Sequence, residues 1–152
     1  MINRRALLKK LVFGLIGLNF LSRRTSAQEV SGDERELNFQ WRVPQAHLET
    51  VKNELRFNGE IKEEQGTKGG WIFVFIGVVL IPYLAKAVLA LRREIIHGGI
   101  VIDTRGDKIN IDTDKSLPGG VIVMVSKEST EIFERNEISD PTELVSALMK
   151  GL

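Results

Sequence analysis

Apolar and polar side chains alternate strictly over residues 37–43, and this period of two predicts a strand with one buried face. Pro44 then suits the first turn of a helix, and apolar residues at spacings of three and four continue that helix to residue 57. Residues 60–65 predict a short strand, which a glycine-rich turn follows. The pattern of residues 28–70 therefore predicts a small polar β-α-β segment.

The longest apolar stretch, residues 71–91, has two interpretations. The only charged residue of this stretch is Lys86. Two arginines, at residues 92 and 93, follow the stretch directly. A transmembrane helix accounts for the length, for Trp71 at one end and for the basic pair at the other. The alternative is a buried strand over residues 71–80, followed by a helix that begins at Pro82 and ends before a pair of glycines.

The surroundings of residues 71–80 favour the transmembrane span. As a strand, this segment would place apolar side chains on the side of the sheet where the neighbouring strand 37–43 is polar. These side chains are Ile72, Val74, Ile76 and Val78. They would need a cover, such as the C-terminal part of the chain or a partner. The soluble alternative has the merit of completing the β-α-β-β-α-β order of ferredoxin-like folds.

Residues 92–152 predict a second small α+β unit. Short apolar runs separated by polar turns predict four strands, at residues 100–102, 108–112, 121–125 and 131–133. Asp140, Pro141 and Glu143 predict the start of a C-terminal helix, as a cap, a first-turn proline and an acid near the helix dipole. The expected fold is α+β: a small βαβ segment, a single transmembrane span and a hairpin-rich antiparallel sheet with a C-terminal helix. The alternative is a soluble ferredoxin-like βαββαβ core with extra strands.

Residues 1–27 have the three parts of an export signal. A basic start precedes an apolar core at residues 11–21, and residues 25–27 place small side chains before a cut at Gln28. The apolar core is too short to span a bilayer as a helix. Residues 3–9, Asn-Arg-Arg-Ala-Leu-Leu-Lys, resemble the bacterial twin-arginine pattern. A Sec signal and an uncleaved signal-anchor helix are the alternatives.

Charge and cysteine content exclude several classes of function. The basic residues of the signal region have no acidic counterpart there, so the rest of the chain is net acidic. An acidic remainder argues against non-specific binding of nucleic acid, which needs a clustered basic face. The chain has no cysteine, which excludes disulfides, thiolate metal sites, cysteine nucleophiles and a lipoprotein anchor.

Acidic residues and histidines are the candidates for chemistry. The acidic candidates are Asp103, Asp107, Asp112 and Asp114. The run from Asp112 echoes the start of a calcium loop, but Leu117 and Val123 stand where that loop needs glycine and a bidentate glutamate. We interpret His47 as a solvated helix residue and His97 as a cation at a helix C-terminus.

No sequence motif supports catalysis. Residues 105–107 spell Arg-Gly-Asp, which we interpret as a hairpin turn. The GxSxG, HExxH, Walker and GxGxxG patterns, each with its structural context, do not occur. We therefore predict no catalytic, cofactor-binding or metal-binding residue and no enzymatic activity.

The order of elements carries a resemblance to a known family. The strand at 37–43, the helix at 44–57, the apolar segment that ends in Ala-Leu-Arg-Arg at 90–93, the hairpin at 105–108 and the last helix resemble the effector-associated constant component domains of bacterial conflict systems. The resemblance implies a small non-catalytic protein that accompanies an effector.

These observations lead to one functional hypothesis and two alternatives. We expect a bacterial accessory protein of the inner membrane, with its N-terminal part in the periplasm and its C-terminal part in the cytoplasm, that binds a protein partner. The first alternative is a soluble periplasmic α+β binding or inhibitor protein of the immunity type. The second is an enzyme that uses the acidic hairpin.

Overall fold

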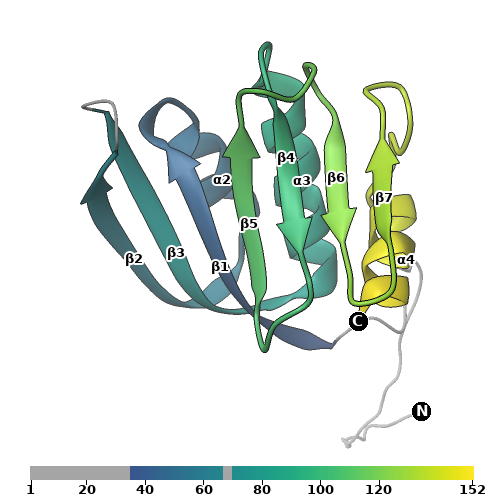
Figure 1. The fold of residues 1–152 in the computed structure, drawn as a ribbon. Helices are drawn as coiled ribbons and strands as arrows, with labels where there is room; N and C mark the ends of the chain where they lie inside the picture. Colours follow the sequence, from purple (N-terminus) through teal and green to yellow (C-terminus); the bar gives the residue numbers. More distant parts are fainter. Residues whose placement is uncertain (1–34, 67–69) are drawn as a thin grey trace, which may run out of the picture. The chain divides into compact units, whose positions relative to one another are not determined.

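The computed structural model describes residues 35–66 and 70–152, and the predicted signal at residues 1–27 lies outside them (Figure 1). Strand β1 (Glu36–Pro44) confirms the period-two prediction, since Phe39, Trp41 and Val43 are completely buried. Beyond it, a 3-10 turn η1 (Gln45–His47) leads into α2 (Leu48–Glu54). Strand β2 (Phe57–Gln65) is longer than predicted.

Residues 71–91 form a strand and a helix, so the predicted transmembrane span is wrong. Strand β3 (Trp71–Leu80) runs directly into α3 (Ile81–Glu94), with Pro82 in the first helical turn. Among the residues that the structure describes, no helix combines the length and the apolar character needed to cross a membrane. The fold class that rested on a single-pass span is corrected accordingly.

Helix α3 resembles a membrane span because it is buried on several sides. It packs on the sheet and also contacts α2 on one flank and the C-terminal helix α4 (Pro141–Gly151) on the other. Only a narrow strip of α3 therefore meets water, and the exposed Lys86 lies on that strip. A helix that is apolar almost all round is either in a membrane or in the middle of a helical layer.

The C-terminal half forms the predicted strands and helix. The strands are β4 (Gly99–Asp103), β5 (Ile109–Asp114), β6 (Ile122–Val125) and β7 (Thr130–Phe133). Asp140 caps α4 by accepting a hydrogen bond from the Thr142 amide at 2.7 Å, and Glu143 completes a capping box. The sequence predicted the hairpin and the helix start in this half because hairpin turns and helix caps are local signals.

All seven strands join one mixed sheet in the order β2-β3-β1-β5-β4-β6-β7. The first six elements follow a ferredoxin-like order, and β1, β2 and β3 pair antiparallel as that fold requires. The difference lies at β5, which inserts between β1 and β4 and pairs parallel with β1. A second parallel pair, β4 with β6, extends the sheet further. The sheet is therefore mixed, whereas the sequence led us to expect an antiparallel one.

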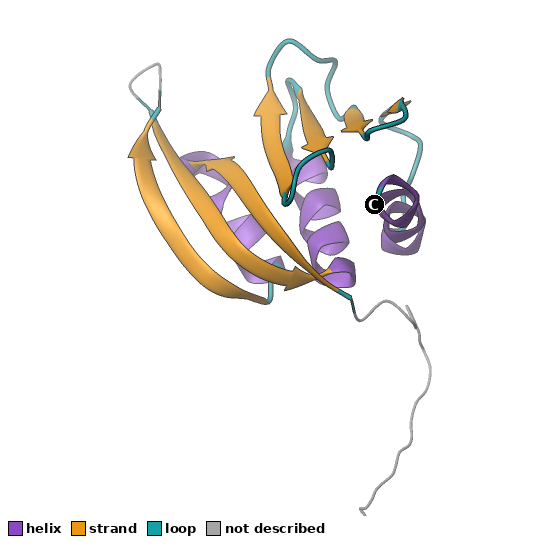
Figure 2. Cartoon of the chain, turned by 60° about the horizontal axis from the view of Figure 1, so that its bottom comes forward, coloured by secondary structure: helices purple, strands orange, loops and turns teal. Residues whose placement is uncertain are grey.

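The helices α2, α3 and α4 all lie on the same face of this sheet (Figures 1 and 2). The core fills the space between them and the central strands. Its strand residues are Phe39, Trp41, Phe75, Ile100, Ile102, Ile111 and Ile122, and its helix residues include Val51, Leu84, Val88, Leu91, Leu144 and Leu148. Within the described part of the chain, the opposite face carries no helix; we call it the open face.

Candidate functional site

The open face carries a row of apolar side chains that reaches the β7 edge of the sheet. Val101 of β4 pairs with Val123 of β6, and Val123 pairs with Ile132 of β7. Val101 and Val123 alternate with the buried residues of their own strands, and Ile132 lies in register with Val123, so all three are on the open face. Ile132 is 62% exposed, although isoleucine is a residue that folding normally buries. We call these three residues the valine row.

A second apolar stripe on the open face is already covered. Strand β3 presents Ile72, Val74, Ile76 and Val78 there, which are the residues that argued against a buried strand. The neighbours β1 and β2 lay long polar side chains over them: Arg42 pairs with Val74 in register, and its guanidinium lies 3.3 Å from Glu64 Oε1 across the strand. Val74 is consequently only 1% exposed. The aliphatic parts of such side chains cover apolar surface while their charges stay in water.

Polar residues separate the covered stripe from the valine row. Asp112 of β5 stands in this band, and burial raises the pKa of its carboxyl group, while a hydrogen bond from the Thr113 amide and the positive charge of Arg42 oppose the rise. Asp103 of β4 lies nearer the hairpin turn and pairs with Arg105 at 2.8 Å. The open face thus combines an exposed apolar row with fixed charges of both signs.

The four candidate aspartates do not converge on one point. Asp103 holds Arg105 at the turn of the β4–β5 hairpin, and this pairing lowers the pKa of Asp103. Asp114 lies at the other end of that hairpin, where it accepts hydrogen bonds from the amide and hydroxyl of Ser116. Among the described residues, no group of three potential ligands is placed to hold a metal ion. The Arg-Gly-Asp run lies between β4 and β5, as a turn.

Both histidines line one groove, which the sequence did not indicate. This groove has a volume of about 360 Å³ and lies where β1 and β5 end and α3 gives way to β4. His47 Nδ1 lies 2.7 Å from Glu94 Oε1, and the Thr50 hydroxyl donates to the second oxygen of Glu94. Two hydrogen bonds lower the pKa of Glu94. The one from Thr50 has the larger effect, and the one from His47 follows. His47 is thus tied to Glu94 rather than free on a solvated helix face.

Further polar residues line the groove beside this pair. They are His97, Asp114 and Lys115. Among the described residues, the side-chain hydrogen bonds of His47 and Glu94 link these two residues and Thr50. The His47–Glu94 contact joins η1 to the end of α3.

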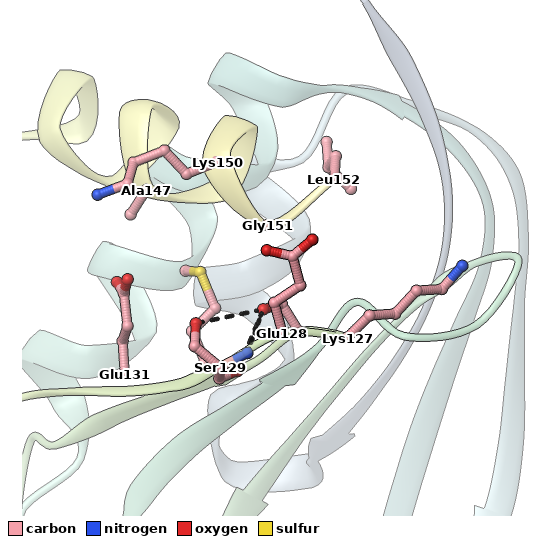
Figure 3. Close-up of a pocket in the computed structure, with 10 residues that line it drawn as sticks. Lys127, Glu128, Ser129, Glu131, Ala147, Lys150, Gly151 and Leu152 are labelled. Carbon is pink, nitrogen blue, oxygen red and sulfur yellow. Dashed lines mark hydrogen bonds between the residues drawn. The ribbon is translucent and has the colours of Figure 1, made fainter.

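A second hollow, of about 300 Å³, lies between the β6–β7 turn and the end of α4. Figure 3 shows the ammonium groups of Lys127 and Lys150 pointing in opposite directions, with Glu128 between them. Ser126 and Ser129 bond to each other across the turn. Because its charges diverge and its serines serve the turn, this hollow has no convergent set of ligand groups.

The chain was compared with protein-family models, curated proteins and solved structures. No protein-family model, curated protein or solved structure matches the chain. The open face is therefore the candidate site on its own physical features. Sequence reasoning identified its strands but not the valine row, because a row across three strands depends on a register that local patterns do not specify.

Proposed function

We propose that residues 35–152 form a non-enzymatic domain that binds a protein partner through the valine row. The observation that carries the proposal is the exposure of Ile132 at the end of a row of cross-strand apolar neighbours. Apolar contacts of this kind form the centre of protein interfaces, and polar residues form their rim.

The edge position of the valine row adds to this argument. Strand β7 pairs with β6 on one side only, so its other side offers unpaired backbone groups. A partner that adds a strand to such an edge gains backbone hydrogen bonds and continues the apolar row. The opposite edge, β2, is less suited because its exposed residues include Glu60, Lys62 and Glu64, and charges on an edge discourage pairing.

Photo-crosslinking in the full-length chain tests the proposal. A photoreactive amino acid at position 132 should capture a partner in bacterial cells that make the chain at its natural level. The matched control places the same amino acid at Lys86, which is also exposed but lies on the helical side. Excess unlabelled wild-type chain should compete for the partner, and an Ile132→Glu chain should not. Equal capture from both positions would contradict the proposal.

The place of action is a separate part of the proposal. We propose that the predicted signal exports the domain and that the domain acts outside the cytoplasm, as an accessory or immunity-type binding protein. The resemblance to effector-associated constant component domains stays a prediction. The mass of the mature protein tests cleavage before Gln28, and carbonate extraction of membranes distinguishes a released domain from one held by an uncleaved anchor.

A further inference from the structure

Three arginine side chains line one small hollow beside the end of α3. Arg92 and Arg93 come from the last turn of α3, and Arg135 comes from the segment after β7. The hollow has a volume of about 200 Å³, and Leu89, Ile138 and Ser139 complete its lining. We call it the arginine hollow.

Arg92 is a buried charge that the fold holds in place. It is only 7% exposed, and it donates hydrogen bonds to the carbonyl oxygens of Ile138 at 2.8 Å and Glu137 at 2.6 Å, and to that of Arg135. These bonds use three of its five N–H groups, so the Nε–H and one Nη1–H have no partner among the described residues. Carbonyl dipoles satisfy donors but do not cancel a full charge.

Arg135 is exposed, but it also contacts the backbone. Its Nη1 donates to the Ile95 carbonyl, and its side chain lies over Gly120. Gly120 has φ 81°, a conformation that favours glycine. Of the three arginines, Arg92 is therefore the one that several hydrogen bonds hold, and Arg135 has one.

No carboxylate neutralises this cluster within the described part of the chain. The ion pairs there involve Arg42, Arg105, His47 and Lys62. The nearby carboxylates of Glu137 and Glu143 accept hydrogen bonds from backbone amides instead. Burial and the neighbouring Arg135 both lower the pKa of Arg92, as expected for like charges without a counter-ion.

We propose that the arginine hollow binds a phosphate-type oxyanion. Planar guanidinium groups offer paired N–H donors that match the oxygens of a phosphate. The apolar side chains of Leu89 and Ile138 beside them reduce the screening by water, which strengthens the attraction. The hollow is smaller than sites for drug-sized ligands, so it suits one phosphate group rather than a whole cofactor. This site is distinct from the valine row, and the proposal does not depend on the proposed function.

Thermal unfolding of the full-length chain in inorganic phosphate tests the proposal, against chloride at the same ionic strength. A ligand at about ten times its Kd should raise the Tm of the wild-type chain by about 3–6 °C. Arg93→Gln and Arg135→Gln should lose at least half of this rise, and in chloride Arg93→Gln should not be less stable than wild type, because it removes a repulsion. Arg93 is exposed, so its variant folds even if that of Arg135 does not. The matched control is Arg105→Gln, which removes a paired arginine elsewhere and should keep the full rise.

The same thermal unfolding measured in sulfate and in acetate tests which class of anion binds. A rise with sulfate but not with acetate supports a tetrahedral oxyanion, and an equal rise with acetate overturns the assignment to phosphate. No rise in the wild type overturns the proposal. The same rise in the wild type and in all variants shows a general salt effect and overturns it as well.

Discussion

The two faces of the sheet differ in what covers them, and strand β3 shows the difference at adjacent residues. Phe75 lies under the helical layer and is completely buried, whereas Ile76 lies on the open face and is only partly covered. One face is closed by helices that pack side chain against side chain. On the other, the stripe of β3 is covered only by long polar side chains that reach across from β1 and β2.

Strand β3 is apolar on both faces, although among the described residues only one of these faces carries helices. The helical face supplies most of the stability, because close packing against α2, α3 and α4 removes its side chains completely from water. The open face of β3 is covered only by long polar side chains, and the valine row ends in the exposed Ile132. We therefore expect stability to depend mainly on the helical face, and we propose the open face for recognition.

The largest effect should follow from a cavity on the helical face. Phe75→Ala should lower the free energy of unfolding by about 3–5 kcal/mol, because the helices cannot close the space that the ring leaves. Urea unfolding followed by circular dichroism measures the loss. Ile76→Ala is the matched control on the open face and should cost less than half as much. Equal losses for the two variants would contradict the difference between the faces.

A smaller effect should show how the β3 stripe is covered. Val74→Ala and Arg42→Ala should each lower the free energy of unfolding, and the two losses should not add. The expected coupling is about 0.5–1 kcal/mol, because the stem of Arg42 loses its apolar contact when Val74 is cut back. A double-mutant cycle by urea unfolding gives this coupling. Additive losses would mean that Arg42 acts through Glu64 alone.

A pH dependence should come from Glu94, at the groove on the helical side. Its pKa is lower in the folded chain than in the unfolded chain, so its contribution is present above the unfolded pKa and is lost as the pH falls through the folded pKa. Glu94→Gln should therefore be less stable than wild type by under about 1 kcal/mol near neutral pH, since the pair is exposed to solvent.

The difference between wild type and Glu94→Gln should shrink as the pH falls into the acidic range and the wild-type carboxylate is protonated. Unfolding midpoints measured across this range provide the test, and Glu49→Gln, on the neighbouring helix, is the control. A difference that does not change with pH would show that Glu94 contributes by packing rather than by charge.

The sequence predicted those elements whose signals are local. Alternation identified β1, and Asp140, Pro141 and Glu143 identified the start of α4. The sequence also showed the long apolar run at residues 71–91. Whether that run was a membrane span or a buried strand and helix depended on the packing of α2 and α4 against α3, which no local pattern contains. The insertion of β5 between β1 and β4 is a long-range pairing of the same kind.

The candidate sites were less predictable than the elements, for the same reason. His47 and Glu94 meet although 46 residues separate them in the chain, and Arg135 reaches the end of α3 from beyond β7. Their sequence neighbours carry no motif that indicates these meetings. The cross-strand register that forms the valine row likewise exists only in the folded sheet.

The smallest effect on stability should come from the most exposed residue of the open face. Ile132→Glu should change the free energy of unfolding by no more than about 0.5 kcal/mol, because the side chain already meets water. The same change should abolish partner capture at the valine row, since a carboxylate at the centre of an apolar contact must be desolvated without a partner. Urea unfolding and photo-crosslinking from a second probe at Val125, measured on the same variant, separate the two quantities. A variant that unfolds early and loses capture would show only that the sheet needs Ile132, whereas one that keeps its stability and loses capture shows that the open face is a surface for binding.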